Sequence, residues 1–386
     1  MSTHVVYLDN HSSTLVDPRV VEAMLPYFSD NPANPANPYH LPGRRAAEAV
    51  ERARQQVAQL IGADDHEVLF TNGATESNNM AILGLLRGTP DGLPRRVLTS
   101  AIEHKSVLAC VEQAAREGIE TCVVGVDRYG HVDLDMLRRA LRQPTLLASI
   151  QVANNEIGTV QRIQSISRMV HEAGALLHCD AAQAVGKIPL NVHEMDIDLM
   201  SISAHKMYGP KGVGALYIRS GMRRLLRPLH YGGGQERGLR PGTLNVPAIV
   251  GFGEACRLCM NMMEHDARAT GQMRDLFEQN LMEQLPGITR NGDLRNRLPN
   301  NSSLTIPGVD ADALLLNLPD LALSTGAACT AGAIEPSHVL QAIGLSRENA
   351  YRTIRVGFGR FNTTGEVQYA AERIVQVLRQ MSPSAG

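Results

Sequence analysis

The sequence lacks any apolar stretch that approaches the roughly 20 residues needed to span a membrane. Its first residues, Met1–Tyr7, also lack the basic segment and long apolar run of a secretory signal peptide. The formal net charge is only −2, so no electrostatic argument favours nucleic acid or an anionic membrane as a partner. We therefore expect a cytoplasmic or organelle-matrix protein with no direct nucleic-acid or membrane contact.

Cysteine is too scarce to indicate a disulfide-stabilised scaffold, because only six cysteines occur in 386 residues. Cys256 and Cys259 have the spacing of a redox pair, but they lie in a helical pattern with no second pair nearby to complete a zinc site. We interpret them as ordinary, partly buried thiols and expect no metal site.

Helical and strand-like patterns alternate through the first two thirds of the chain. Apolar residues recur every three or four positions over Arg45–Ile61, and a second helical pattern covers Val160–Ala173. Short apolar runs typical of buried strands lie at Val97–Thr99, Cys122–Val126, Leu146–Val152, Ala175–Cys179, Leu199–Ser203 and Val213–Ile218. This order predicts an α/β fold with a mostly parallel sheet. The last two runs are too close for a crossover helix, which favours an antiparallel pair.

The pattern changes after about residue 255, where long helices flank short strands. The helices are expected at Cys256–Gln284 and Thr364–Gln380, and the strands near Asn301–Ile306 and Arg355–Gly357. We predict a second, α+β domain here. Near the start of the chain, Asn31–Pro38 carries three Asn-Pro pairs and is therefore predicted to be a loop.

Lys206 is the first candidate catalytic residue. It follows the strand-like run Leu199–Ser203 and precedes a turn rich in glycine and proline. Ligands of α/β proteins gather beyond strand ends, and a dehydrated lysine at such a place can form a Schiff base. The alternative is an ordinary solvated lysine. The glycines that follow do not match a nucleotide-binding P-loop.

Four further strand ends carry polar residues that suit a phosphorylated aromatic ligand. Asp180 can pair with a protonated pyridine nitrogen, or simply cap a helix. The segment Thr71–Asn79 offers Gly73 and Thr75 at a helix start, for a phosphate or as a plain cap.

His104 and Asn154–Glu156 follow the other two strand-like runs. His104 can stack on a ring or lie on the surface, and the asparagines can bind a cofactor oxygen or make a turn. Each signal is ambiguous alone, but all five strand ends are expected at one edge of the sheet, which favours a shared ligand.

Cys329 lies in a different setting, among the small residues of Ser324–Ala333. Two glycines and no large side chain make a mobile loop plausible, and a thiol that has to visit two places needs such a tether. The alternative is a tightly packed turn with an inert cysteine.

Taken together, these segments resemble the cysteine desulfurases of the IscS/NifS type, within the class V, fold-type I enzymes that use pyridoxal 5′-phosphate (PLP). The similarity runs almost end to end, and its motifs are specific in combination. They are Tyr7–Asn10, Asn34-Pro35 with His40, Gly73–Ser77, Glu103–Lys105, Asn154–Gly158, Asp180–Gln183, Ser203–Lys206, Gly232–Arg237 with Gly242-Thr243, and Ile354-Arg355. The segment from Ala328 to Ser337 resembles the long catalytic loop of the family's first group.

The resemblance implies a role for each of these residues. Lys206 would hold PLP covalently, Cys329 would receive sulfur, and His104 would stack on the ring. The remaining ring and phosphate contacts would come from Ala74, Thr75, Asn155, Asp180, Gln183, Ser203 and His205, with Thr243 reaching in from a partner subunit. Arg355, and Asn155 with it, would bind the substrate carboxylate.

The resemblance also implies the architecture and the partners. A large PLP-binding domain with a mostly parallel, seven-stranded sheet would cover residues 15–255, and a small α+β domain would cover 1–14 and 256–386. The enzyme would be a homodimer that converts L-cysteine to L-alanine and passes sulfur to an acceptor protein, such as an iron–sulfur scaffold or a thiolation enzyme. The tail, which ends at Gly386, lacks the long extension of housekeeping members, and the loop at Ala36–Tyr39 departs from their pattern. Both departures leave nitrogenase, tRNA and DNA sulfur pathways open.

Two other readings of the sequence compete with this one. Another class V enzyme, such as an aminotransferase or a selenocysteine lyase, would not need a cysteine on a small-residue segment. A non-enzymatic binding or scaffold protein would gain little from Lys206.

Overall fold

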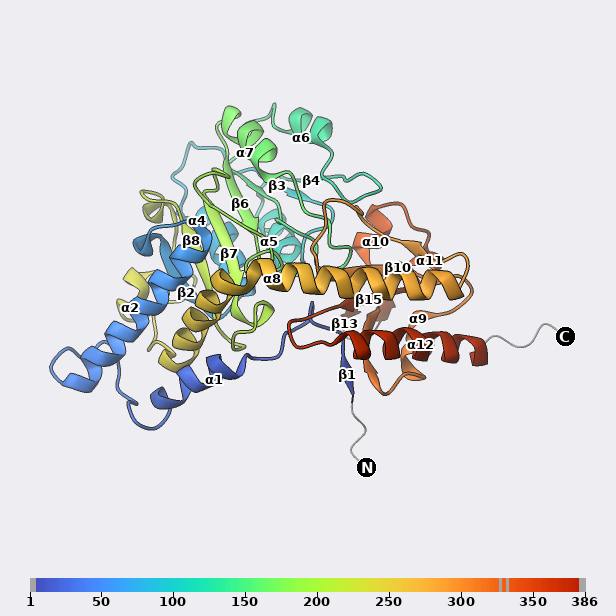
Figure 1. Ribbon diagram of the computed structural model, residues 1–386. Coiled ribbons are helices and arrows are strands. Elements are labelled where there is room, and N and C mark those ends of the chain that lie inside the picture. Colours follow the sequence, from blue (N-terminus) through green and yellow to red (C-terminus); the bar gives the residue numbers. More distant parts are fainter. Residues whose placement is uncertain (1–4, 326–327, 331–332, 382–386) are drawn as a thin grey trace.

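A mixed sheet of seven strands forms the centre of the larger part of the molecule (Figure 1). The computed structural model describes residues 5–325, 328–330 and 333–381. In spatial order the strands are β2 Val68–Thr71, β8 Gly214–Ile218, β7 Leu199–Ser203, β6 Leu176–Asp180, β5 Leu147–Ser149, β3 Val97–Ser100 and β4 Thr121–Val124. Only β8 runs against its neighbours. The predicted α/β fold and the predicted antiparallel pair of β7 and β8 are both confirmed.

Helix α2, Leu41–Ile61, is the helix predicted for Arg45–Ile61. It begins four residues earlier because the imidazole of His40 accepts a hydrogen bond from Gly43 N and Pro42 lies in the first turn. It ends at Gly62, whose φ of 68° is left-handed and suits glycine. Its buried face carries Ala46, Val50, Ala53 and Val57 into the core beside the sheet.

Further helices belong to this part, and all of them except α1 connect successive strands of the sheet. They are α1 Pro18–Met24, α3 Ala74–Asn79, the π-helical turn η3 Met80–Gly84, α4 Leu85–Gly88, α5 Lys105–Arg116, α6 Leu134–Ala140 and α7 Ile163–Glu172. Helix α7 matches the pattern predicted at Val160–Ala173. Because the connections between parallel strands return the chain to the same side of the sheet, the strand ends gather at one edge.

A second core lies around a four-stranded antiparallel sheet in the order β12-β15-β10-β9. Its strands are β12 Ser324–Thr325, β15 Thr353–Gly357, β10 Asn301–Thr305 and β9 Thr289–Arg290. Helices α9 Ala311–Leu316, α10 His338–Ala342, α11 Arg347–Tyr351 and α12 Thr364–Met381 belong to the same C-terminal region, and α12 contributes much of its core. The start of the chain joins this core through Val6 and Leu8, because β1 Val6–Tyr7 pairs with β11 Leu321–Ala322.

Helix α8, Val246–Gln284, is 39 residues long and connects the two cores (Figure 1). It begins ten residues before the predicted start at Cys256, because the Asn245 side chain caps Ala248 N and Pro247 starts the helix. Cys256 and Cys259 are fully buried in the first core, whereas Phe277 packs in the second. We propose that the two domains divide inside this helix, near the predicted boundary at residue 255.

Several shorter features bear on the site. Asn31–Pro38 is a loop, as its Asn-Pro pairs predict. Near Cys329 the strand β13, Ala328–Thr330, pairs in antiparallel fashion with β14, Ala333–Glu335, where the sequence left a mobile loop or a tightly packed turn open. In the part of the chain that the structure describes, no helix is both long and apolar enough to cross a membrane.

Candidate active site

A cavity of about 610 Å³ opens at the carboxyl edge of the large sheet. Polar groups from both cores line it, and all but two of the predicted site residues lie in its wall. The lining includes His11, Ser12, Gly73, Ala74, Thr75, His104, Gln151, Asn155, Asp180, Gln183, Ser203, His205, Lys206, Lys211 and Arg355. The five strand ends singled out by the sequence therefore meet at one place.

Lys206 follows β7 and turns its amine toward the start of the chain. Its Nζ donates to the carbonyl oxygens of His11 at 2.8 Å and Ser12 at 2.6 Å. Burial, and then the positive charge of Arg355, lower the pKa of Lys206 to about 8. Within the described residues no carboxylate lies within ion-pair distance of Lys206, so a substantial fraction is neutral near pH 8 and available as a nucleophile.

Asp180 ends β6 and lies buried at the bottom of the cavity. Its Oδ2 accepts from Asn78 Nδ2 at 2.8 Å, and its Oδ1 accepts from Ala182 N at 3.0 Å. The capping alternative is thus partly right, although Ala182 begins a turn and not a helix. Asn78 fixes the orientation of the carboxylate from the side of α3.

The region predicted to hold phosphate is built from two adjoining turns. Gly73 has a φ of 129°, which favours glycine, and a Cβ placed there would lie 3.7 Å from Ser203 Oγ. A Cβ at Gly214 would lie only 2.6 Å from Gly73 Cα. The backbone of β8 and the turn at Gly73 therefore pack too closely to admit a side chain at Gly214. Burial, and then the charge of Lys206, lower the pKa of His205 to about 4, so its imidazole is neutral at pH 7.

His104 caps α5 and is exposed to the open cavity. Its Nδ1 accepts from Ser106 N at 3.1 Å, and Ser106 Oγ lies 2.7 Å from the same nitrogen. Desolvation by the walls of the cavity lowers the pKa of His104. Because Nδ1 acts as an acceptor, the neutral ring carries its proton on Nε2.

Arg355 comes from β15 of the second core. Its Nη2 donates to Asp9 Oδ1 at 3.1 Å and to Ser12 Oγ at 2.8 Å, while Nη1 makes only a 3.4 Å contact with Asn155 O. The buried Nε has no hydrogen-bond partner among the described residues. Nη2 is therefore fully engaged, whereas Nη1 makes only this one long hydrogen bond and retains donor capacity for a carboxylate in the cavity that Arg355 lines.

Of the two remaining predicted residues, Thr243 does not line this cavity, and the side chain of Cys329 lies outside the described residues. Thr243 is exposed in the loop before α8. For Cys329 the structure describes the backbone of β13, and the thiol lies outside the described atoms, so its distance from Lys206 stays a prediction.

Three residues around the site were not identified as site residues from the sequence. His11 and Ser12, which accept hydrogen bonds from the amine of Lys206, lie 195 and 194 positions from it in the sequence. No local sequence pattern predicts such a contact. Lys187 is only 8% exposed and donates to Gln183 Oε1 at 2.9 Å. Its spacing of four from Gln183 is visible in the sequence, but its burial is not.

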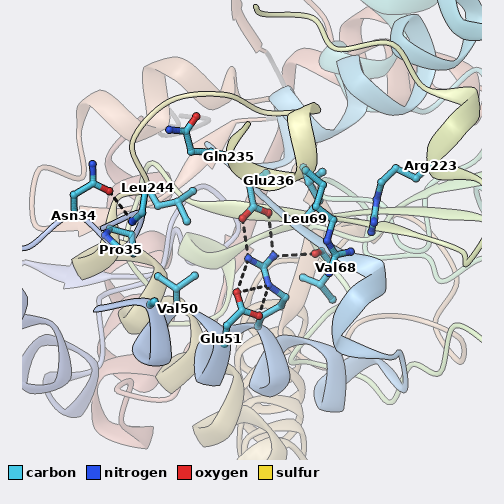
Figure 2. Close-up of a pocket in the computed structure, with 14 residues that line it drawn as sticks. Asn34, Pro35, Val50, Glu51, Val68, Leu69, Arg223, Gln235, Glu236 and Leu244 are labelled. Atoms are coloured by element: carbon cyan, nitrogen blue, oxygen red, sulfur yellow. Dashed lines mark hydrogen bonds and ion pairs between the residues drawn. The ribbon is translucent and has the colours of Figure 1, made fainter. Parts of the chain in front are cut away.

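A second cavity, of about 280 Å³, lies between α2 and the segment Gln235–Leu244 (Figure 2). Arg54 Nη1 and Nη2 donate to the carboxylate of Glu236 at 2.9 and 2.8 Å, and Phe70 N donates to the same group at 2.8 Å. Glu51 completes the surroundings of the guanidinium. Glu236 itself has a left-handed φ of 45°, so the ion pair holds a strained turn.

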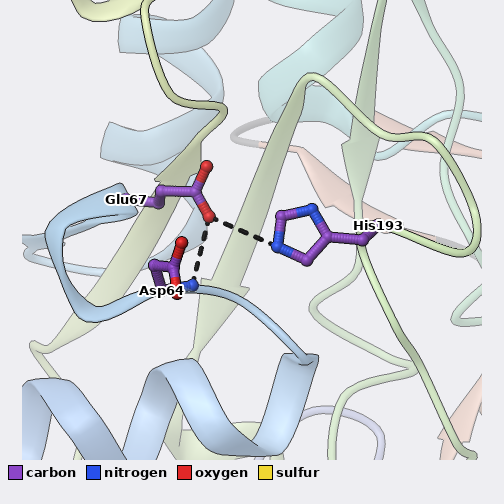
Figure 3. Close-up of side chains that lie close together, drawn as sticks. All are labelled: Asp64, Glu67 and His193. Atoms are coloured by element: carbon purple, nitrogen blue, oxygen red, sulfur yellow. Dashed lines mark hydrogen bonds and ion pairs between the residues drawn. The ribbon is translucent and has the colours of Figure 1, made fainter.

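Asp64, Glu67 and His193 bring three metal-type side chains together away from the main cavity (Figure 3). Glu67 Oε1 accepts from Ser220 N at 2.7 Å, and its Oε2 accepts from Asp64 N at 3.1 Å. Both oxygens already serve backbone donors, so we interpret this group as a cap for the turn Asp65–Glu67.

Comparison with known proteins places this site in a family. The model of the aminotransferase class-V family matches residues 6–370. The cysteine desulfurase IscS of Rickettsia typhi is 45% identical over 381 residues, which cover 98% of this chain and 93% of that protein. The chain belongs to the aminotransferase class-V family and, within it, to the cysteine desulfurases.

Solved structures agree with this assignment. A NifS-like protein matches with a TM-score of 0.91 and 35% identity, covering 98% of this chain and 100% of that one. SspA, solved in complex with cysteine, matches with a TM-score of 0.82 and 37% identity, covering 93% and 100%. The predicted fold class is therefore confirmed, and the enzyme is a cysteine desulfurase of a family that uses PLP.

Proposed function

We propose that this enzyme binds PLP in the large cavity, removes sulfur from free L-cysteine and carries it on Cys329. The observation that carries the proposal is that the weakly bonded Nη1 of Arg355 and the amine of Lys206 belong to the wall of one cavity. An amino acid placed with its carboxylate on Arg355 has its α-carbon near Lys206, because both side chains contact Ser12. SspA, the relative solved with cysteine, supports the same class of substrate.

The chain offers suitable groups for each part of PLP. Asp180 would hold the pyridine nitrogen, with Asn78 keeping the carboxylate in place. Ala74, Thr75, Ser203 and His205 would bind the phosphate, and His104 would cover the ring. Gln183 and Asn155 would contact the phenolic oxygen.

Bound PLP supplies an electron sink that acidifies the α-proton of cysteine. Lys206 Nζ then takes that proton and returns it, which its lowered pKa permits near neutral pH. The Cys329 thiolate attacks the substrate sulfur: a sulfur–sulfur bond forms, the Cβ–S bond breaks, and its electron pair stays on Cβ, which takes up the proton that the substrate thiol gives up, so that alanine and a persulfide anion on Cys329 result. Arg355 holds the carboxylate throughout.

The test is alanine formation from cysteine by the PLP-loaded protein, without any added keto acid. A desulfurase makes alanine and releases sulfide when a thiol reductant is present. An aminotransferase would need a keto acid, and a selenocysteine lyase would turn over selenocysteine but not cysteine. Either of those outcomes would contradict the proposal.

We also propose that the active form is a homodimer. Thr243 is exposed and outside the cavity of its own chain, as a residue that completes a partner's site would be. Large apolar side chains are also exposed near Thr243 in sequence and in the N-terminal segments, which is typical of an interface: they are Tyr231, and Leu25, Phe28, Tyr39 and Leu41.

Mixed dimers test this arrangement. In a hybrid of a Lys206→Ala chain and a Thr243→Ala chain, one of the two sites would be intact if Thr243 acts across the interface. Such hybrids should recover about half of the wild-type PLP sites, with wild-type affinity. If Thr243 acts within its own chain, no site in the hybrid is intact and no recovery occurs.

The sulfur acceptor is proposed to be a protein, such as an iron–sulfur scaffold or a thiolation enzyme. The antiparallel pair β13–β14 presents Cys329 on a separate two-stranded element that such a protein could approach. Co-purification with the persulfide form of the enzyme would identify it.

A further inference from the structure

Lys187 is a buried amine that the mechanism above does not use. It lies in the turn after β6 and is 8% exposed. Its Nζ donates to Gln183 Oε1 at 2.9 Å, and in the described part of the molecule no carboxylate lies within ion-pair distance. A methionine would fill such a place without the cost of burying a charge, so packing alone does not explain a lysine.

Lys187 and His11 together decide which way the Gln183 amide faces. An ammonium group has only donors, so the atom of Gln183 that meets it has to be the oxygen. The opposite end, Nε2, donates to His11 O at 2.9 Å. Flipping the amide would bring two donor groups together and would leave His11 O facing an oxygen.

This orientation controls what Gln183 offers to the cavity. The Nε2 group carries two hydrogens, and His11 O takes one of them. The second hydrogen is left to donate to an oxygen of a ligand in the cavity that Gln183 lines. The amide therefore presents a donor, which suits an anionic oxygen on an aromatic ring.

We propose that Lys187 is a positioning residue for PLP: it fixes Gln183 as a hydrogen-bond donor and places a positive charge behind the phenolic oxygen. This inference rests on the proposed function, because it assumes that PLP occupies the cavity. Lys187 does not touch the ligand and acts through Gln183.

The electrostatics around Lys187 agree with this role. Burial, followed by the charge of Lys206, lowers the pKa of Lys187 to about 7, and Arg355 acts in the same direction. Cys259 opposes these effects, and neutral His11 lies across Gln183. An anionic oxygen bound beside Gln183 would favour the charged form of Lys187, so the ligand and this lysine stabilise each other's charges.

The test is a pH titration of the visible absorbance of bound PLP. In Lys187→Met the midpoint should rise by about one pH unit, because a nearby positive charge that opposes protonation is gone. Lys187→Gln, which keeps a donor without the charge, should give at least half of that shift and serves if the methionine variant does not fold. Ile188→Val, a half-buried neighbour, should leave the midpoint unchanged.

A double-variant cycle shows whether the effect passes through Gln183. In a Gln183→Ala background, Lys187→Met should shift the midpoint by less than half as much as in the wild type. Equal midpoints for the wild type, Lys187→Met and Lys187→Gln would overturn the inference, as would a full shift without Gln183. If the wild type shows no PLP absorbance at all, the proposed function fails, a result distinct from these.

Discussion

The buried arginine at the smaller cavity and the buried lysines at the larger one have opposite surroundings. In the smaller one, the carboxylates of Glu236 and Glu51 surround Arg54, and although burial alone would lower the pKa of Arg54, these partners raise it. At the larger one Arg355 is also paired, with Asp9, but among the described residues the amines of Lys206 and of Lys187, which lies behind Gln183, meet only carbonyl and amide oxygens, and their pKa values fall.

This difference between the two kinds of buried charge distinguishes a cavity with a structural role from one suited to catalysis. A paired charge holds its protonation state and stiffens the fold, whereas an unpaired amine in a dry site can lose its proton near neutral pH. We therefore assign the smaller cavity to positioning the segment that leads to Thr243, and the larger one to catalysis.

The largest expected effect is at Lys206. Lys206→Ala should abolish alanine formation from cysteine, because Lys206 is the proposed base and cofactor anchor. Lys206→Arg, which keeps the charge but cannot form the bond to PLP, should be equally inactive. Alanine assays with added PLP check this, and measurable turnover by either variant would contradict the assignment.

Cys329→Ser should be nearly as damaging to turnover while sparing binding. The variant should bind PLP and show a cysteine-induced spectral change, because those steps use Lys206, Asp180 and Arg355. Alanine and sulfide formation should fall by at least about 100-fold, since a hydroxyl is not ionised at neutral pH. In the wild type, mass spectrometry after one turnover should find the added sulfur on the Cys329 peptide. A persulfide on Cys110 or Cys179 would show that the wrong nucleophile was chosen.

Breaking the Arg54–Glu236 pair should cost stability rather than chemistry. Arg54→Met leaves a buried carboxylate without its partner and should lower the free energy of unfolding by about 3 kcal/mol. The double variant Arg54→Met with Glu236→Gln should recover part of this loss, because the unpaired charge is removed. Urea unfolding of the three proteins measures both, and a more stable single variant would undermine the contrast between the cavities.

A buried lysine without an ion-pair partner should make the stability of the apoprotein depend on pH. Lys187 titrates at about 7 in the folded apoprotein, against about 10.4 when unfolded, so between these values the unfolded state binds more protons. Lys187→Met should therefore raise the apoprotein Tm by about 3 °C at pH 7, and the gain should shrink as the pH approaches about 10. Lys105→Met, at an exposed site, serves as the control and should leave the Tm unchanged at every pH in the same thermal scans. A gain independent of pH would indicate a packing effect instead.

The smallest effects are expected at Cys256 and Cys259. Burial raises the pKa of both thiols, to about 11 for Cys259, so neither is a nucleophile at neutral pH. Alanine at either position should leave turnover within a few-fold and lower stability by about 1 kcal/mol. A large loss of turnover would revive the redox-pair interpretation of their spacing.

The features that the sequence could predict are those set by residues close together along the chain. Strand ends, the helix pattern of α2 and the Asn-Pro loop are local signals, and they located Lys206, Asp180 and His104 correctly at one sheet edge. Contacts between segments far apart in the sequence have no such local signal. The Arg54–Glu236 pair joins residues 182 positions apart. The oxygens that accept from Lys206 are backbone carbonyls, which every residue type carries, so the sequence cannot predict that contact.

The central claim is that the unpaired lysine facing the larger cavity holds the cofactor. Borohydride treatment of the PLP-loaded enzyme fixes the cofactor on the amine that bears it, and peptide mapping then identifies the residue among the chain's four lysines: Lys105, Lys187, Lys206 and Lys211. The account predicts one modified peptide, carrying PLP on Lys206. Modification of Lys187 or Lys211 with Lys206 untouched would contradict it.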